Sequence, residues 1–397
     1  MALDAELDLQ LAVHKEKRRL RVRQSMVQLE HASCQIDNKH YVNFASNDYL
    51  GLSQHDALKR AATRAINQYG VGSGSSAQVS GFHPEHEALQ EEFAEWLGVD
   101  AVLLYSSGYL ANVGALTALL SRKQLVVHDK DNHASLLDGS LQAHARIQRF
   151  AHNNMLELAR LLEKAKARHL WVVSEALFSM DGYTVPINAL VEIIKQFQLN
   201  LLLDETHSLG IIGSKGQGLI QAYARDVNLE KMPEDYLLTA GLGKAFGVMG
   251  GVVAGSRNLI DYLTQFSRSA IYTTAQPPAL AAAARASLAL IRAEQGDELR
   301  GKLKENIGLF HRYCNQLGVI YHQGSRSPIQ AIILKTEQGV LDWQQALKKH
   351  GFWVAVMRPP SVAEGASRLR ITITAAHRKA DIQGLVEVLA RLQELKS

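Results

Sequence analysis

An acid and an imidazole directly follow an apolar run near the middle of the sequence. The segment LLLDETHSLG begins at Leu201 and places Asp204 and His207 just after the run. In parallel sheets, ligands bind at the carboxyl ends of the strands. Taken alone, the pair is equally consistent with a helix-capping aspartate and a surface histidine. If the run is a buried strand, we expect Asp204 to face the ligand-binding crevice and His207 to lie in the next turn.

A lysine surrounded by glycines follows a second apolar run. Lys244 stands in TAGLGKAFGVMGG, where the neighbouring glycines allow a close approach of the backbone to another group. A P-loop is excluded, because that motif requires glycine at position 238, which is leucine here. A lysine and an aspartate at strand ends of one sheet suit pyridoxal 5'-phosphate (PLP). Its aldehyde forms a Schiff base with a lysine, and its ring nitrogen pairs with a carboxylate.

Three further segments supply side chains for a PLP site. In YSSGYLANVGAL, Gly108 separates a strand from a helix, whose N-terminal amides would hold a phosphate. In DNHASLLDG, His133 follows a strand and could stack on a flat ring, although a lone histidine here is more often a cap or a core residue. In SEALFSMDG, Ser179 and Asp181 follow another strand, but serine turns are common and give a weak signal.

Other motifs carry less chemical information. His83 and His86 in HPEH have a metal-compatible spacing, but no third ligand accompanies them, so we expect no metal. The segment GVGSGSS resembles a dinucleotide-binding loop but lacks its third glycine and follows a helix-like stretch. The basic stretch HKEKRRLRVRQ, residues 14–24, is predicted to be the solvated face of an N-terminal helix, with one arginine free to reach an acidic ligand.

The chemistry-bearing residues follow short apolar runs that alternate with helical segments. These runs predict strands beginning at Ala101, Gln124, His169, Leu199, Asp235 and Gly250. Between most of them lie segments of helical period, such as PINALVEIIKQFQ, whose Pro186 suits a first helical turn. The alternation predicts an α/β fold with a mostly parallel sheet and helices on both faces.

The two ends of the chain have a different pattern. A charged helix precedes the strand and turn in YVNFASNDYLGL. After an alanine-rich helix from Pro277, three segments are predicted strands: AIILKT, FWVAVMRPP and RLRITIT. We therefore expect residues 1–48 and 286–397 to form a smaller α+β domain, and residues 49–285 to form the large PLP-binding α/β domain.

The composition is that of an ordinary globular chain: 397 residues, of which 47% are hydrophobic and 21% are charged. The net charge of +4 is too small to indicate nucleic-acid binding. Because no run of about 18 apolar residues occurs, we expect no membrane span. Cys34 and Cys314 form neither a disulfide framework nor a metal motif, which favours a reducing, cytoplasmic location.

Together these segments resemble the α-oxoamine synthases, a PLP-dependent family with the aspartate aminotransferase fold (fold type I). The similar blocks span nearly the whole chain: NFASNDYLGLS, GSGSSAQVSGFHPEHEALQ, DNHASLLDG, EALFSMDG, LLLDETHSLGIIGSKGQG, GLGKAFG, IYTTAQPPA and RLRITITAAH. Within the family, FSMDG, SPIQ, MRPPSV and TITAAH are most similar to the branch of biotin biosynthesis. The resemblance implies an acyltransferase that condenses L-alanine with pimeloyl-CoA or pimeloyl-acyl carrier protein, releasing CO2 and a free thiol.

The resemblance also implies roles for the residues of the cofactor site. Lys244 would form the Schiff base and move the α-proton, Asp204 would pair with the ring nitrogen, and His133 would stack on the ring. His207 would act in catalysis beside the ring hydroxyl, near Ser179. The phosphate would be held by the amides of Gly108 and Tyr109.

For the substrates, Arg370 would bind the amino-acid carboxylate and Arg21 the acyl chain, with Ser361 and His133 in the same site. Thr273 or Thr274 would reach the phosphate of the partner subunit, which implies a homodimer with shared active sites.

Three positions differ from the family pattern. Members usually carry threonine where this chain has Gly241, alanine where it has Thr206, and threonine where it has Ser361. A threonine hydroxyl at 241 would hydrogen-bond the phosphate, so we expect Gly241→Thr to raise cofactor affinity about tenfold if the backbone there has an ordinary φ.

Two alternative functions stay open at this stage. Glycine-using relatives, of the 2-amino-3-ketobutyrate CoA ligase or 5-aminolevulinate synthase type, are possible because the sequence does not fix the size of the substrate pocket. A non-catalytic subunit or regulator with the PLP fold is disfavoured by the presence of Lys244.

Overall fold

The computed structural model describes residues 3–165, 170–227 and 236–395. The chain forms two compact units. The smaller comprises Met1–Tyr49, Met180–Gly182 and Gly301–Ser397, and the larger comprises Leu50–Ser179 and Tyr183–Arg300. His169 and Asp235, with which two of the expected strands begin, lie outside the described residues.

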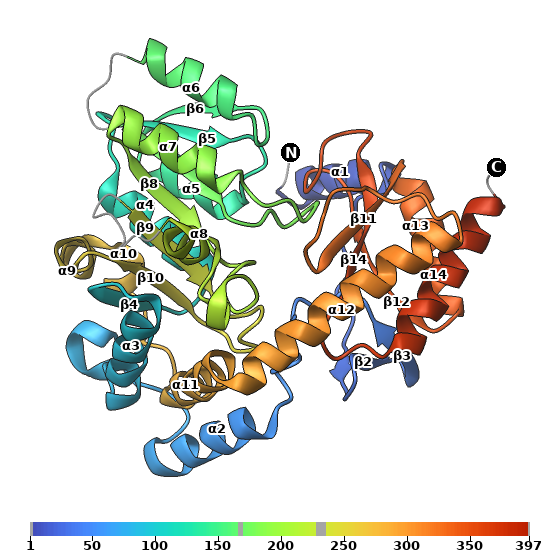
Figure 1. The fold of residues 1–397 in the computed structure, drawn as a ribbon, viewed down its shortest axis with the longest axis horizontal. Helices are drawn as coiled ribbons and strands as arrows, with labels where there is room; N and C mark the ends of the chain where they lie inside the picture. Colours follow the sequence, from blue (N-terminus) through green and yellow to red (C-terminus); the bar gives the residue numbers. More distant parts are fainter. Residues whose placement is uncertain (1–2, 166–169, 228–235, 396–397) are drawn as a thin grey trace. The chain divides into compact units, whose positions relative to one another are not determined.

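A seven-stranded sheet forms the centre of the larger unit. Its strands are β4 (Ala101–Tyr105), β5 (Leu125–Asp129), β6 (Arg146–Phe150), β7 (Leu170–Glu175), β8 (Asn200–Asp204), β9 (Tyr236–Gly241) and β10 (Gly251–Gly255). Their order across the sheet is β4-β10-β9-β8-β7-β5-β6 (Figure 1). Only β10 runs against its neighbours, and the other adjacent pairs are parallel. The predicted α/β fold class is therefore confirmed.

Burial explains which of these strands could be predicted. Every residue of β5, β7 and β10 is buried, as expected for strands covered on both faces, and their sequences are correspondingly apolar. Strand β6 was not predicted. It lies at the edge of the sheet, and its sequence RIQRF is mostly exposed, so it lacks the continuous apolar run that marks a buried strand.

The helices of the larger unit connect these strands and cover the sheet. They are α2 (Asp56–Tyr69), α3 (Pro84–Leu97), α4 (Gly108–Leu119), α5 (Ala134–Gln142), α6 (Met155–Lys164), α7 (Ile187–Phe197), α8 (Leu219–Asp226), α9 (Arg257–Phe266), α10 (Arg268–Ile271) and α11 (Pro278–Arg292). From α4, Ala111, Ala115 and Leu116 pack into the main apolar cluster with residues of the strands. Pro186 is the N-cap of α7 rather than a residue of its first turn.

The division between the units falls at Arg300, inside α12 (Glu294–Gln316), and not at the expected position 285. Position 285 lies within α11, whose alanines Ala279 and Ala282 pack against Ala61 and Ala65 of α2. The whole of α11 is therefore part of the core of the larger unit.

The smaller unit contains two small sheets. The first has the order β1-β2-β3-β12, and the second has the order β11-β14-β13. Their strands are β1 (Val27–Gln28), β2 (Ser33–Ile36), β3 (Lys39–Asn43), β11 (Ile329–Lys335), β12 (Phe352–Trp353), β13 (Ala355–Met357) and β14 (Ser367–Thr372). Its C-terminal part also contributes α13 (Glu337–Lys349) and α14 (Lys379–Glu394). Because β12 pairs in parallel with β3, both ends of the chain build one sheet.

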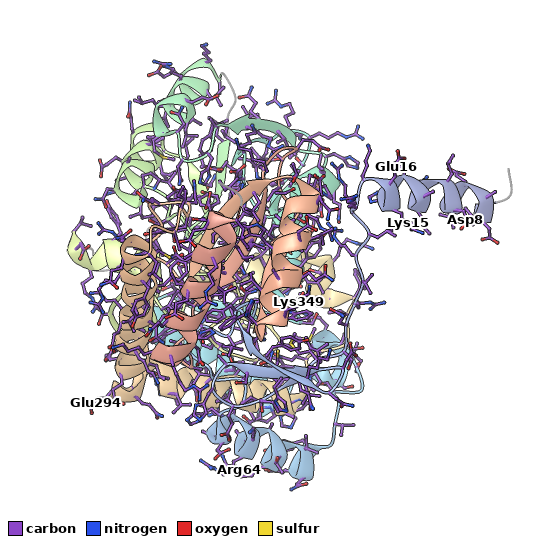
Figure 2. The ribbon with its side chains drawn as sticks, turned by 90° about the vertical axis from the view of Figure 1, so that its right-hand side faces the viewer. Asp8, Lys15, Glu16, Arg64, Glu294 and Lys349 are labelled. Carbon is purple, nitrogen blue, oxygen red and sulfur yellow. The ribbon has the colours of Figure 1, made fainter. Side chains whose placement is uncertain are left out.

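The N-terminal helix α1 (Leu3–Glu16) has no buried residue. Figure 2 shows its side chains, among them Asp8, Lys15 and Glu16, pointing outward from different sides of the helix. The helix ends before most of the basic stretch, so residues 17–24 are not the helical face that the sequence predicted. Within the described part of the chain, no helix has both the length and the apolar character needed to cross a bilayer.

Candidate active site

The strand register brings the predicted site residues to one edge of the large sheet. Asp204, the last residue of β8, pairs with Glu175 of β7 and with Thr239 of β9. At the same edge, Gly251 of β10 pairs with both Tyr105 and Gly241, the last residues of β4 and β9. The loops that carry Gly108, His133 and Lys244 all leave from the carboxyl ends of these strands, as expected for a ligand site in a parallel sheet.

The Asp204 carboxylate is buried and held in place by two donors. Asn112 Nδ2 donates to Asp204 Oδ2 at 2.6 Å, and the backbone N–H of Thr206 donates to Oδ1 at 2.8 Å. Asn112 is itself fixed, because its Oδ1 accepts from Thr239 Oγ1 at 2.6 Å and its Nδ2 also donates to Ser135 Oγ at 2.9 Å. A buried, oriented carboxylate at a strand end is the group that a protonated ring nitrogen requires.

The imidazole of His133 is linked to Asp204 through the same network. Ser135 Oγ lies 2.8 Å from His133 Nδ1, and the Ser135 backbone N–H donates to that nitrogen at 3.3 Å. Because the Ser135 backbone N–H donates to Nδ1, that nitrogen is an acceptor, and the Ser135 hydroxyl donates its hydrogen to it as well. The neutral His133 ring therefore carries its hydrogen on Nε2. Its backbone N–H donates to Glu175 Oε1 at 2.6 Å, while the ring remains exposed.

The N-terminus of α4 forms an anion-binding end of the site. Ser107 caps the helix by accepting from the Leu110 N–H at 3.2 Å, and Gly108 and Tyr109 occupy the first turn, where amides have no intrahelical partner. Gly108 is required, because a Cβ there would lie 2.7 Å from the Cα of Gly241. Tyr109 turns its hydroxyl to Asp138 Oδ2 at 2.5 Å and contacts the His133 ring edge-on.

The loop that carries Lys244 is compact. The Leu242 N–H donates to Gly250 O at 2.9 Å, and the Gly247 N–H donates to Lys244 O at 3.0 Å. Gly247 has a φ of +66°, and a Cβ there would lie 2.5 Å from Ser53 N, so glycine is needed for both conformation and space. The loop fixes the backbone of a half-buried lysine at the carboxyl end of β9.

These residues fit PLP by their chemistry. A lysine amine is present for the aldehyde, a buried carboxylate for the ring nitrogen, a helix N-terminus for the phosphate and an imidazole for the ring face. By contrast, Glu205 is structural. Its carboxylate caps α8 by accepting from the N–H groups of Leu219 and Ile220 at 2.9 and 2.8 Å, and burial raises its pKa.

Two other predicted cofactor residues lie in loops after the central strands. His207 is buried in the turn that follows β8, at 7% exposure. Ser179 follows β7 and is half-buried, next to Phe178, whose N–H donates to Tyr183 O at 2.9 Å.

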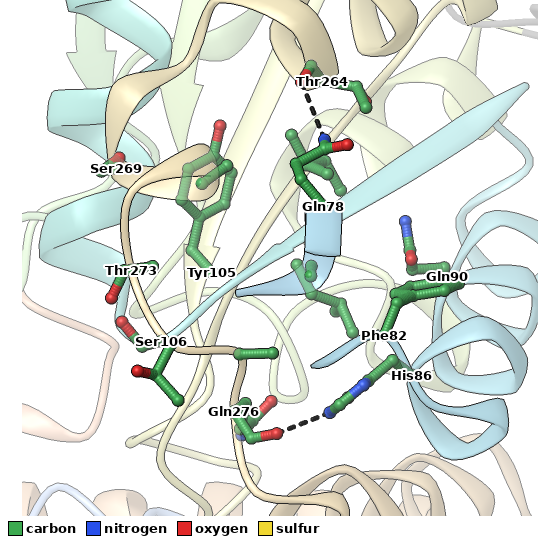
Figure 3. A pocket seen from close by; sticks show the side chains of 16 residues that line it. Gln78, Phe82, His86, Gln90, Tyr105, Ser106, Thr264, Ser269, Thr273 and Gln276 are labelled. Carbon is green, nitrogen blue, oxygen red and sulfur yellow. Dashed lines mark hydrogen bonds between the residues drawn. The ribbon is translucent and has the colours of Figure 1, made fainter. Parts of the chain in front are cut away.

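Thr273 and Thr274 lie elsewhere. They line a separate cavity of about 280 Å³, whose lining includes none of Lys244, Asp204 or His133 (Figure 3). Figure 3 also shows that His86 lines this cavity, and its ring Nε2 is hydrogen-bonded to the backbone oxygen of Gln276 at 2.7 Å. The motif HPEH is thereby explained by structure: His83 caps α3, and the Nδ1 of His86 accepts from the His83 N–H at 3.0 Å. Burial lowers the pKa of His86.

The predicted substrate residues belong to the smaller unit. Arg370 on β14 is buried, and its Nη1 donates to Asn47 Oδ1 at 2.8 Å and to Thr372 Oγ1 at 3.1 Å. Arg21 and Ser361 are in contact, with 3.3 Å between Nη2 and Oγ. The sequence interpretation missed Arg358, which is anchored by the backbone carbonyls of Arg18 and Leu20. Burial and the charge of Arg21 lower the pKa of Arg358.

Two residues of the central network were also missed. Asn112 is a polar residue inside the otherwise apolar helix GYLANVGAL. A single polar residue in an apolar helix indicates a buried polar contact, so the sequence does contain a signal for Asn112. Ser135 has no such signal, because a serine in the first turn of a helix is common.

Comparisons with known proteins identify the family of the chain. The chain matches the family model of class I and II aminotransferases over residues 39–389. It is similar to the 8-amino-7-oxononanoate synthase of Saccharophagus degradans, with 40% identity over 394 residues, 99% of this chain and 97% of that protein. The enzyme of the same name from Pseudescherichia vulneris is 41% identical over 390 residues, 98% of this chain and 99% of that protein.

Solved structures confirm the fold. A serine palmitoyltransferase determined with PLP superposes with a TM-score of 0.91 at 25% identity, covering 100% of this chain and 99% of that chain. The 8-amino-7-oxononanoate synthase of Francisella tularensis gives a TM-score of 0.75 at 26% identity, covering 90% of this chain and 98% of that chain.

Proposed function

The chain belongs to the class I and II aminotransferase family, in its α-oxoamine synthase group, and from this premise we propose that it condenses L-alanine with a pimeloyl thioester. The products are 8-amino-7-oxononanoate, CO2 and the free thiol, in biotin biosynthesis. One observation carries the assignment: 40% identity over 394 residues to an enzyme of that name. The fold alone would not choose among acyl-transferring relatives, because one fold hosts many substrates.

PLP is the cofactor, and it supplies an aldehyde for amines and a ring that accepts the electron pair left at the substrate α-carbon. Lys244 Nζ would hold the cofactor covalently, and its amine would serve as the base for the α-proton of L-alanine. The Asp204 carboxylate, fixed by Asn112, would pair with the ring nitrogen, and the α4 amides of Gly108 and Tyr109 would bind the phosphate.

His133 and His207 are assigned to the ring face and the ring hydroxyl, near Ser179. With Nδ1 bound to Ser135, the Nε2–H of His133 would be the donor available to a bound substrate. Such a donor would stabilise the negative charge that develops on the thioester carbonyl oxygen when the α-carbon attacks the carbonyl carbon. The Cα–C bond then forms, the C–S bond breaks to release the thiol, the carboxylate of alanine leaves as CO2, and the electron pair left at Cα takes up a proton.

The arginines of the smaller unit bind the carboxylates of the substrates. Arg370, oriented by Asn47 and Thr372, takes the carboxylate of L-alanine in a bidentate pair. Arg21, in contact with Ser361 and accompanied by Arg358, takes the distal carboxylate of the pimeloyl chain.

A homodimer with shared sites completes the proposal. The family resemblance assigns the hydroxyls of Thr273 and Thr274 to the phosphate of a partner subunit, and the cavity that they line includes none of Lys244, Asp204 or His133. Cys34 and Cys314 are buried and free, and burial raises their pKa values to about 11 and about 12. Inert thiols of this kind suit a reducing cytoplasm.

Labelled alanine tests the reaction. With pimeloyl-CoA and L-alanine carrying carbon-13 at C1, the label should appear only in CO2, with one thiol released per product. With the label at C3, it should stay in the amino ketone. Retention of the C1 label in the product would exclude decarboxylation, and a transaminated or racemised alanine without thiol release would exclude acyl transfer.

A further inference from the structure

Thr206 and Gly241 face each other between the ends of β8 and β9. The Gly241 N–H donates to Thr206 Oγ1 at 2.8 Å. A Cβ built on Gly241 would lie 3.3 Å from Thr206 Cγ2 and 3.5 Å from its Oγ1. The side chain of Thr206 therefore fills the space into which a side chain at 241 would point.

The same space borders the anion-binding end of the site. The Cβ position on Gly241 also lies 3.4 Å from the Cα of Gly108, the first residue of α4. Meanwhile the Thr206 backbone N–H is bound to Asp204 Oδ1. Thr206 thus spans the site, with its backbone at the carboxylate and its hydroxyl near the helix N-terminus.

The hydrogen-bond directions leave one donor unused. Thr206 Oγ1 accepts from Gly241, and a hydroxyl has one hydrogen of its own to donate. Among the hydrogen bonds of residues 3–165, 170–227 and 236–395, none takes that hydrogen to a protein acceptor. A phosphate at the N-terminus of α4 is an acceptor of suitable charge.

We propose that the Thr206 hydroxyl donates to the phosphate of PLP, and that Thr206 and Gly241 form a compensating pair. In this pair, residue 206 supplies the hydroxyl that would otherwise come from residue 241. The inference rests on the proposed function only in taking PLP as the cofactor.

This pairing reverses the expectation drawn from the sequence for Gly241→Thr. The φ of Gly241 is not in the left-handed region, so the backbone accepts a side chain. The obstacle is Thr206: a Cβ already lies tightly against it, and the Oγ1 and Cγ2 of a new threonine would add to the overlap. Gly241→Thr alone should therefore weaken cofactor binding.

The test is a double-mutant cycle on cofactor affinity. Apo forms of the wild type, Thr206→Ala, Gly241→Thr and the double variant are titrated with PLP by absorbance above about 400 nm, where a Schiff base absorbs. Thr206→Ala should weaken PLP binding about 10- to 150-fold, the range for a hydrogen bond to a charged group. Gly241→Thr should also weaken it, and the double variant should return to within about threefold of the wild type.

Pyridoxal without its phosphate is the matched control ligand, and Thr206→Ser the matched control variant. Pyridoxal affinity should change less than about threefold in Thr206→Ala, and Thr206→Ser should keep most of the PLP affinity. Equal losses for both ligands would overturn the proposal, since the hydroxyl would then serve only the Gly241 backbone. A Gly241→Thr variant that binds PLP more tightly than the wild type, or a double variant no better than the singles, would also overturn it.

These outcomes are separate from the test of the reaction. A wild type that binds PLP but does not turn over L-alanine with pimeloyl-CoA leaves the pair intact and removes the substrate assignment. A wild type that does not bind PLP removes both.

Discussion

Ser135→Ala isolates the link between His133 and Asp204. Ser135 is completely buried, accepts from Asn112 at 2.9 Å and lies 2.8 Å from His133 Nδ1. Losing the hydrogen bond to His133 costs about 0.5–1.5 kcal/mol, and leaving a buried Asn112 N–H without an acceptor costs about 1–3 kcal/mol. We expect the free energy of unfolding to fall by about 2–3 kcal/mol.

The same helix offers a matched control. Ser140 on α5 is also completely buried, and its Oγ lies 2.9 Å from His128 Nε2. Burial lowers the pKa of His128 to about 4, so this serine–histidine pair is neutral at pH 7. Ser140→Ala should lower the free energy of unfolding by a similar amount but should leave the hydrogen bonds of the active site unchanged.

The assay combines nitrogen-15 NMR of histidine-labelled enzyme with steady-state kinetics. Ser135→Ala should shift the His133 Nδ1 resonance, because that nitrogen loses the Ser135 hydroxyl and keeps only the backbone N–H of residue 135. It should also lower kcat/KM about 2- to 13-fold below that of Ser140→Ala, the factor that corresponds to one neutral hydrogen bond. Equal kcat/KM values in the two variants, or an unchanged His133 Nδ1 resonance in Ser135→Ala, would refute the role given to this network.

Three further predictions concern the lysine, the acyl site and the response to acid. Lys244→Ala should abolish the borohydride-reducible bond to PLP and nearly all turnover, and near-normal turnover by the variant would contradict the assignment. Arg21→Ala should raise the KM for pimeloyl-CoA about tenfold while leaving that for butyryl-CoA, which has no distal carboxylate, unchanged; an equal rise for both donors would assign Arg21 a structural role. His128 and His377 are buried with pKa values lowered to about 4, so their contribution to stability is present above about pH 6.5 and is lost as pH falls toward 4. Between these pH values, the free energy of unfolding should fall by about 1.4 kcal/mol per pH unit for each histidine. His128→Gln should therefore reduce the pH dependence of the denaturant midpoint between about pH 6.5 and 4.5, and an unchanged pH dependence would contradict this.

The sequence predicts the central sheet and the residues at its carboxyl edge well. Buried parallel strands are apolar throughout, and the polar side chains of the site come directly after them in the sequence. Asp204 and Lys244 can be placed in this way without coordinates. The edge strand β6 cannot, since its exposed residues give no apolar run. The domain division within α12 also depends on which helix packs on which core.

Contacts between side chains of different elements are the part that the sequence cannot supply. Asn112, Ser135 and Asp204 are far apart in the chain, and only the fold brings them into one network. Gly241 and Thr206 were each recognised as unusual, but their significance as a pair depends on the direction of one side chain. For this reason the pair predicts weaker PLP binding by Gly241→Thr, whereas the sequence alone predicts tighter binding.

The joining of L-alanine to a pimeloyl group is tested most directly by a matrix of kcat/KM values. The holoenzyme is assayed by thiol release with L-alanine, glycine and L-serine, each against pimeloyl-, acetyl-, succinyl- and palmitoyl-CoA. L-Alanine with pimeloyl-CoA should give the highest value, with glycine roughly 10- to 200-fold lower, since one methyl group in a fitted pocket contributes about 1–3 kcal/mol. A higher value for glycine with acetyl- or succinyl-CoA, or for L-serine with palmitoyl-CoA, would contradict the account.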